Sequence, residues 1–302
     1  MKRFPFPARR ALRPLTLSVL AAAVVLPAQA GDTLAKIAST GKITVAYRES
    51  SVPFSYLDGT RPVGLTMDMS NAIVAAVRKQ LKRPDIKVEM QAVTSQNRIP
   101  LLTNGTIDLE CGSTTNNSAR AKEVDFAINH FYTGTRLAVK ARSGIHGYAD
   151  LKGKVVAVTT GTTNVQVMRK YLVDHHLDAK MVMAKDHADA FLMVETGRAD
   201  AFAMDDVLLF GLIANSRTPH DYAVVGTPLQ VEPYACMLRK DDPRFKTLVD
   251  GTIGHMMKSG EFTRLYTRWF MQPIPPRNVR INMPMGPQLK ANLHNLSDRP
   301  AT

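Results

Sequence analysis

A pattern that occurs twice, a buried strand followed by a hydroxyl-rich loop and a helix, constrains the fold of this chain most. Residues 107–111 form a short apolar segment that opens into the loop 112–117. Residues 155–158 form an unbroken apolar run before a second hydroxyl-rich loop, 159–164. Strand and helix signals alternate along the rest of the sequence in the same way. This order predicts α/β units, each with a parallel sheet that helices cover on both faces.

The pattern restarts near residue 134, which indicates two similar α/β units joined by strands, with a cleft between them. Because ligands of open α/β sheets sit beyond the C-terminal ends of the strands, we expect the two loops to face each other across this cleft. A helix starting after residue 117, with Arg120 in its first turns, would offer free N–H groups to a carboxylate. An ordinary capped helix is the alternative reading of this segment.

The first thirty residues predict a cleaved secretory signal peptide. A basic segment, residues 2–13, precedes an apolar core, residues 15–26, and the small-residue cleavage site Ala28-Gln29-Ala30. The apolar core is too short to predict a membrane span. No cysteine follows the cleavage site, so we expect a periplasmic protein without a lipid anchor.

The remaining 272 residues carry a formal charge of +8, against +13 for the whole chain of 302. We expect no nucleic-acid partner, because the sequence lacks a basic run interleaved with aromatic residues. This excess of positive charge suits a protein that binds an anionic ligand. A basic surface exposed to solvent is the alternative explanation.

Two cysteines in an exported chain, Cys111 and Cys236, favour one disulfide. Closing so long a loop would stabilise the fold by ~4–5 kcal/mol on the chain-entropy model. Two free buried thiols are the alternative. Neither cysteine has the spacing of a metal site and the histidines are scattered, so we expect neither a metal nor another cofactor.

Several blocks of the sequence resemble the periplasmic glutamate/aspartate-binding proteins of ABC importers, the acidic-amino-acid branch of the family 3 solute-binding proteins. They are residues 48–55, 94–100, 110–117, 185–187, 204–206, 234–243 and 269–276. The resemblance spans nearly all of the chain after residue 30. It implies a type II periplasmic binding protein, with two α/β lobes joined by two crossover strands around a ligand cleft.

By the same resemblance, lobe 1 comprises residues 32–135 and 232–270, lobe 2 comprises residues 136–231, and residues 271–302 form a C-terminal extension. The family's binding residues, carried across position by position, imply a three-part site. The α-carboxylate meets Arg120, Ser113, Thr115, Thr162 and Thr163, the α-ammonium meets Asp205, and the side-chain carboxylate meets Arg48, Ser95, Arg98 and His187.

Each residue also has a simpler interpretation. An isolated arginine such as Arg48 or Arg98 is usually at the surface, and His187 beside Asp186 would by default start a helix. Asp205 or Asp206 would by default cap the next helix. One of the two can cap the helix while the other faces the ligand.

The charges of the implied site favour an acidic ligand. Three arginines stand against Asp205 alone, so two of them would face the amide of a bound glutamine without an anion. Breaking a buried charge pair costs about 3–5 kcal/mol, which predicts at least ~100-fold rejection of glutamine. Glutamate and aspartate differ by one methylene, typically ~1–3 kcal/mol, so binding of both is expected.

The resemblance therefore implies a monomeric binding protein that delivers L-glutamate or L-aspartate to an inner-membrane ABC permease, and no catalysis. Another dicarboxylate ligand is one alternative. A dehydratase on the same fold is the other, and it would need a general acid in the cleft, for which Glu49 and Glu110 are the candidates.

Overall fold

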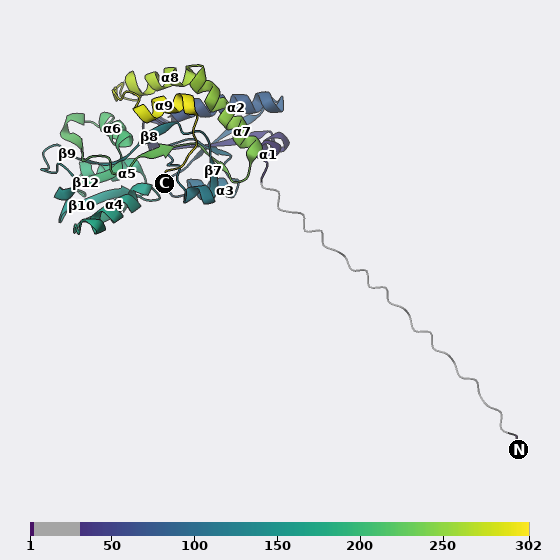
Figure 1. Ribbon diagram of the computed structural model, residues 1–302, viewed down its shortest axis with the longest axis horizontal. Coiled ribbons are helices and arrows are strands. Elements are labelled where there is room, and N and C mark those ends of the chain that lie inside the picture. Colours follow the sequence, from purple (N-terminus) through teal and green to yellow (C-terminus); the bar gives the residue numbers. More distant parts are fainter. Residues whose placement is uncertain (3–30, 302) are drawn as a thin grey trace.

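The computed structural model describes residues 1–2 and 31–301, and residues 31–301 form two lobes side by side (Figure 1). The predicted signal peptide lies almost entirely outside the described residues. Among those that are described, no helix has the length and apolar character needed to cross a membrane.

Each lobe is built on a five-stranded sheet. The first sheet has the order β5 (Lys87–Ala92), β1 (Lys42–Tyr47), β6 (Leu109–Glu110), β15 (Met237–Arg239) and β7 (Val124–Phe126). The second has the order β11 (Lys180–Ala184), β10 (Val155–Thr159), β12 (Ala201–Asp205), β9 (Thr135–Lys140) and β13 (Tyr222–Val225). The two sheets draw their strands from the residues proposed for lobe 1 and lobe 2, except that β9 begins one residue before the proposed boundary.

The prediction of a parallel sheet in each lobe is confirmed for the three βαβ strands and wrong for the pairing of the other two strands of each sheet. Strands β1, β5 and β6 run parallel, as do β10, β11 and β12, but β15 is antiparallel to β6 and β7, and β9 is antiparallel to β12 and β13. Strands β15 and β9 each follow a passage of the chain from one lobe to the other, so they enter their sheets against the direction of the βαβ strands.

The passages between the lobes form a small antiparallel ladder of β8 (Phe131–Thr133) and β14 (Glu232–Tyr234), which we call the hinge strands. A second small sheet in lobe 1 consists of β2 (Ser50–Ser51), β3 (Ser55–Asp58) and β4 (Arg61–Val63).

Helices cover the sheets as the apolar periodicity predicts. They are α1 (Thr33–Thr40), α2 (Leu65–Leu81), α3 (Arg98–Thr103), α7 (Pro243–Lys258) and α8 (Glu261–Tyr266) in lobe 1, α4 (Thr163–Asp174), α5 (His187–Glu195) and α6 (Asp206–Ala214) in lobe 2, and α9 (Pro287–Asn295) in the extension. Single 3-10 turns lie at Arg120–Lys122, Tyr148–Leu151 and Pro219–Asp221, and a π-helical turn at Thr267–Met271 follows α8.

The helix predicted after residue 117 is not formed. The chain makes only the 3-10 turn Arg120–Lys122 before β7 begins at Val124. Pairing of β7 with β15 ends the turn after three residues, so this loop has no helix N-terminus to hold an anion. In the second copy of the pattern the predicted helix is present as α4.

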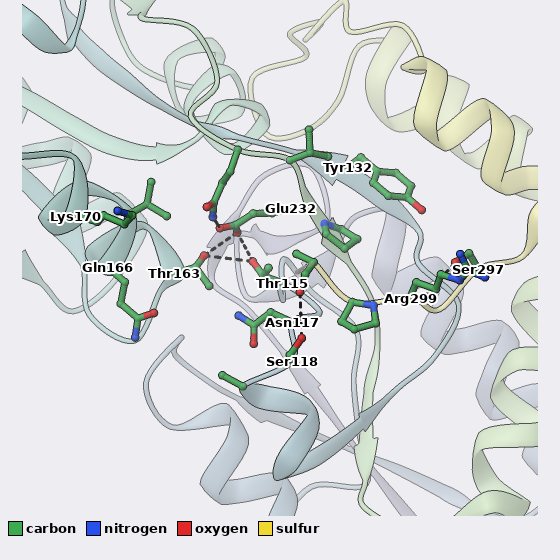
Figure 2. Close-up of a pocket in the computed structure, with 17 residues that line it drawn as sticks. Thr115, Asn117, Ser118, Tyr132, Thr163, Gln166, Lys170, Glu232, Ser297 and Arg299 are labelled. Atoms are coloured by element: carbon green, nitrogen blue, oxygen red, sulfur yellow. Dashed lines mark hydrogen bonds between the residues drawn. The ribbon is translucent and has the colours of Figure 1, made fainter. Parts of the chain in front are cut away.

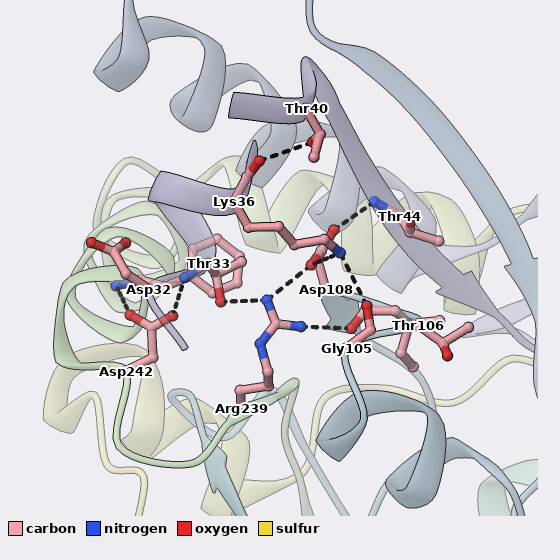
Figure 3. A network of polar contacts seen from close by, with 12 residues as sticks. Asp32, Thr33, Lys36, Thr40, Thr44, Gly105, Thr106, Asp108, Arg239 and Asp242 are labelled. Atoms are coloured by element: carbon pink, nitrogen blue, oxygen red, sulfur yellow. Dashed lines mark hydrogen bonds and ion pairs between the residues drawn. The ribbon is translucent and has the colours of Figure 1, made fainter. Parts of the chain in front are cut away.

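A buried ion network joins the two sequence-distant parts of lobe 1 (Figure 3). The fully buried carboxylate of Asp108 accepts hydrogen bonds from Lys36 Nζ at 2.7 Å and Arg239 Nη2 at 2.9 Å. Asp242 accepts from the backbone N–H of Thr33 at 2.8 Å and of Phe245 at 3.1 Å, so it caps α1 and α7 together. These contacts hold the segment that returns to lobe 1, with Arg239 and Asp242, against helix α1 at the start of the lobe.

Cys111 and Cys236 form a disulfide between the loop after β6 and the start of β15. The bridge closes a loop of 125 residues. On the chain-entropy model, reduction is therefore expected to lower the free energy of unfolding by ~4–5 kcal/mol. Urea denaturation with and without reductant measures this loss. The Cys111→Ala/Cys236→Ala variant, which cannot form the bridge, should show the same loss without reductant. An unchanged free energy of unfolding in either sample would contradict the prediction.

Candidate ligand-binding site

The ten proposed binding residues lie at or after the C-terminal ends of the parallel strands of both sheets, at the interface between the lobes. Arg48 follows β1, Ser113 follows β6, Thr163 begins α4 after β10, and Asp205 ends β12. The lobes are in contact here: Arg48 Nη2 lies 3.2 Å from Asp186 Oδ2 of lobe 2. The loops therefore face each other across the cleft, as predicted.

Arg48 is fully buried and oriented by lobe 2. Its Nη2 donates to Asp186 Oδ2 and lies 3.3 Å from His187 Nε2. Because a guanidinium only donates, His187 Nε2 accepts, and its Nδ1 proton is left for Thr159 Oγ1 at 3.0 Å. Burial and the charge of Arg48 lower the pKa of His187 to about 3, so the ring is neutral at physiological pH.

Buried hydrogen-bond donors without a partner gather beside Arg48. Among the described residues, Arg48 Nε and Nη1, Arg98 Nε and Ser95 Oγ are buried and make no hydrogen bond. An unmade buried hydrogen bond costs about 1–3 kcal/mol, and more for a charged group. A carboxylate, with two acceptor oxygens and a negative charge, matches these groups in both charge and hydrogen-bonding sense.

Arg98 is held from the opposite side by lobe 1. Its Nη1 donates to Thr114 Oγ1 at 2.5 Å and to the Ser113 carbonyl at 3.3 Å, and Thr114 in turn donates to Glu110 Oε2 at 2.7 Å. Burial, with nearby Arg120 and Arg48, lowers the pKa of Arg98 to about 9, while Glu110 opposes that shift. Arg98 therefore stays charged at neutral pH, and a bound anion would raise its pKa again.

Arg120 spans the cleft through main-chain carbonyl groups. Its Nη1 donates to the Thr115 carbonyl of lobe 1 at 2.9 Å, and its Nη2 to the Gly161 carbonyl of lobe 2 at 3.1 Å. Thr162 directs its hydroxyl to the Thr159 carbonyl at 2.7 Å and so stabilises the turn before α4. Ser113 Oγ lies 3.0 Å from Ser51 Oγ.

The two neighbouring aspartates have separate roles. Asp205 is fully buried and accepts hydrogen bonds from the Tyr234 hydroxyl and from Asn164 Nδ2, the latter at 3.2 Å. Asp206 instead accepts from the backbone N–H of Val207 at 2.7 Å, at the start of α6. Burial, and then repulsion from a second acid in the hinge, raise the pKa of Asp205 well above its usual range, which a bound ammonium would reverse.

Two of the acids at this interface, Asp186 and Glu232, have no role in the site predicted from the sequence. Glu232 on β14 accepts hydrogen bonds from Thr115 Oγ1 at 2.5 Å and Thr163 Oγ1 at 2.7 Å (Figure 2). With Glu110, Asp186 and Asp205 it gives four carboxylates around three arginines, so the predicted excess of positive charge is wrong. Unpaired donor positions, rather than net charge, favour an acidic ligand.

A groove of about 760 Å³ lies beside this cluster of threonines and Glu232 (Figure 2). It runs between α4 and the C-terminal tail, and exposed Gln166, Lys170 and Arg299 line it. Neither Arg48 nor Arg98 lines the groove, so we place the candidate ligand site at the buried donors.

Lobe 2 approaches lobe 1 closely at Gly161, which has a φ of +80°. A Cβ atom added there would lie 2.6 Å from the backbone N and Cα of Gln96. The position therefore requires glycine both for its left-handed backbone and for the contact between the lobes.

Comparison with known proteins places the chain in a family. Residues 43–272 match the bacterial extracellular solute-binding proteins, family 3. The chain belongs to this family. It is 47% identical over 271 residues to the "Glutamate/aspartate import solute-binding protein" of Escherichia coli, covering 89% of this chain and 90% of the relative. It is 45% identical over 293 residues to the "L-glutamate/L-aspartate-binding protein" of Pseudomonas aeruginosa, covering 95% and 97%.

A solved structure supports the same fold. An ancestral amino-acid-binding protein, described as a precursor of cyclohexadienyl dehydratase, superposes with a TM-score of 0.67 at 30% identity, over 78% of this chain and 99% of that protein. The two-lobed α/β architecture is that of a type II periplasmic binding protein, as expected from the sequence. Within residues 1–2 and 31–301, no cluster of three or more His, Cys, Asp or Glu side chains could hold a metal ion.

Two buried histidines make the stability of this family member pH-dependent. Burial lowers the pKa of His130, whose Nε2 lies 3.2 Å from the Gly112 carbonyl, to about 4, and that of His187 to about 3. The unfolded chain protonates both near pH 6.5, so stability is lost as the pH falls from 6.5 towards 4. The raised pKa of Asp205 acts in the opposite direction and reduces the slope.

We expect His130→Gln to reduce the pH dependence by about one proton, or ~1.4 kcal/mol per pH unit. Urea denaturation at pH 4.5, 5.5 and 6.5 measures the slope. Replacing the exposed His255 with glutamine is the control and should leave it unchanged. Equal slopes for wild type and His130→Gln would show that His130 is not neutral in the folded protein.

Proposed function

We propose that this protein binds L-glutamate and L-aspartate in the periplasm and delivers them to an ABC-type import permease. The observation that carries the proposal is the group of buried, unpartnered donors on Arg48, Arg98 and Ser95, in a cleft that also contains the buried carboxylate of Asp205. An acidic amino acid offers a second carboxylate for the first group and an ammonium for Asp205.

The proposed contacts follow from these partners. The side-chain carboxylate pairs with Arg48, Arg98 and Ser95, and neutral His187 acts mainly by orienting Arg48. The α-ammonium pairs with Asp205. The α-carboxylate pairs with Arg120 and lies beside Ser113, Thr115, Thr162 and Thr163; because the Thr115 and Thr163 hydroxyls donate to Glu232, these two residues offer the ligand their backbone N–H groups.

Transport rather than catalysis is supported mainly by the relatives. Of the two candidate acids, Glu49 is exposed, whereas Glu110 is buried, accepts from Thr114 through Oε2 and has no partner for Oε1 among the described residues, so Glu110 is the acid that the dehydratase alternative would use. The relatives named above carry glutamate/aspartate binding in their names, and one is named as an import protein. With the predicted signal peptide, these relatives support export of the protein and a membrane permease as its partner.

Calorimetric titration of the purified protein, freed of bound amino acid by unfolding and refolding, tests the proposal. L-glutamate and L-aspartate should bind at micromolar concentrations or below, and L-glutamine at least ~100-fold more weakly, because a neutral amide leaves buried guanidinium groups unpaired. Equal binding of glutamine would mean that Arg48 and Arg98 do not face the ligand side chain. Absence of binding by all three amino acids would favour another dicarboxylate or the dehydratase alternative.

A further inference from the structure

Glu232 occupies a position that touches both lobes and the hinge at once. It lies on the hinge strand β14, is fully buried, and pairs across the ladder with Thr133 of β8. Its Oε2 accepts from Thr115 of lobe 1 and from Thr163 of lobe 2, while its Oε1 accepts from Gln230, two residues before it in the chain. One carboxylate oxygen therefore joins a hydroxyl of each lobe.

The two threonine hydroxyls meet only when the lobes are together. Thr115 lies in the loop after β6 and Thr163 is the first residue of α4, yet their Oγ1 atoms are 3.4 Å apart. A further bond between the lobes, from Arg120 to the Gly161 carbonyl, lies beside them. Rotation of one lobe away from the other would separate these pairs while leaving Glu232 on the hinge.

Charge complementarity favours this arrangement. The Glu232 carboxylate is the main charge that stabilises the half-buried guanidinium of Arg120, and it repels Asp205. Hydrogen bonds from hydroxyl groups to an ionised carboxylate are shorter and stronger than neutral ones. A buried, charged acceptor at the hinge therefore contributes most to the state in which both hydroxyls reach it.

We propose that Glu232 is a latch that holds the two lobes closed over the bound ligand by accepting hydrogen bonds from Thr115 and Thr163 together. Glu232 is a positioning residue. It orients the hydroxyls of Thr115 and Thr163, holds the contact between the lobes, and so lengthens the time for which the ligand stays bound. The latch rests on the proposed function for its ligand, L-glutamate, but the contacts between the lobes that define it do not depend on the identity of the ligand.

Glu232→Gln tests the latch. The amide is uncharged, and its nitrogen must face either the donor nitrogen of Gln230 or the two threonine hydroxyls. We expect the dissociation rate of L-glutamate, measured by stopped-flow fluorescence, to rise about 10- to 100-fold with little change in the association rate. The unfolding temperature of the ligand-free protein should be unchanged. Glu123→Gln, which removes the same charge at an exposed site, is the control and should leave both rates unchanged.

A residue with a purely structural role would lower the unfolding temperature and leave the dissociation rate unchanged, and that result overturns the latch. Small-angle scattering at saturating L-glutamate should show a larger radius of gyration for Glu232→Gln than for wild type, and equal radii would also refute it. Absence of glutamate binding by wild type contradicts the proposed function instead.

Thr163→Val alone should also raise the dissociation rate of L-glutamate, so the latch can be tested even if Glu232→Gln folds poorly. Where both variants fold, a double-mutant cycle combines them. Thr163→Val removes the lobe 2 hydroxyl without changing side-chain volume much. The effect of Thr163→Val on the dissociation rate should be clearly smaller in the Glu232→Gln background than in wild type, because both substitutions remove the same bond. Additive effects would mean that the two residues act independently and would overturn the latch.

Discussion

Arg98→Ala is expected to weaken L-glutamate binding by about 100- to 1000-fold, because the ligand's side-chain carboxylate would lose a buried charged partner. Arg98 is buried, is fixed through Thr114 and the Ser113 carbonyl, and has Nε without a partner among the described residues. L-glutamine should lose much less affinity, so the preference for glutamate over glutamine should fall to within about tenfold. Calorimetric titration with both amino acids measures the two losses.

Two further variants make the result specific. Arg98→Lys keeps the charge but not the planar fork, so an intermediate loss of glutamate affinity is expected. Arg169→Ala, at an exposed position of α4, should bind as wild type does. The unfolding temperature of Arg98→Ala should also be measured, because Glu110 would lose a compensating positive charge and the fold could be destabilised. Equal losses for glutamate and glutamine would show that Arg98 does not contact the ligand side chain.

The sequence could reveal those parts of the site that depend on local chain geometry. Arg48, Ser113 and Thr163 follow strands whose apolar character was visible, so their position at the sheet edge could be predicted. Asp186 and Glu232 could not be identified as partners in this way, because each contacts residues that are distant in sequence. Only the approach of the two lobes places these carboxylates among the arginines and threonines.

The fold shows the same division between local and long-range causes. The apolar periodicity was sufficient to predict α2 and α4, because each buries one face along its own length. The loop after residue 117 has good capping residues, but pairing of β7 with β15 leaves room for a single 3-10 turn. Strand direction in β9 and β15 depends on how the chain crosses between the lobes, which local patterns do not encode.

Gly211→Ala is expected to weaken ligand binding on the order of 10- to 100-fold without touching any proposed ligand contact, because it opposes closure of the lobes. Gly211 lies inside α6 of lobe 2 and faces Val52 of lobe 1. A Cβ atom at this position would lie 2.4 Å from the Val52 carbonyl oxygen and 2.9 Å from its Cβ. The clash involves backbone atoms, so relief requires the lobes to move apart.

The same substitution should not harm folding, since alanine favours a helix over glycine by about 1 kcal/mol. The ligand-free protein is therefore expected to unfold at the same or a higher temperature, while titration shows weaker binding and scattering shows a less compact ligand-bound form. Gly251→Ala is the matched control, because Gly251 also lies in a helix, α7, and an added Cβ would meet no atom within 4 Å. If Gly211→Ala bound glutamate as tightly as Gly251→Ala, the contact between α6 and Val52 would not be needed in the ligand-bound state, and closure would depend on the contacts of Arg48, Arg120 and Glu232 alone.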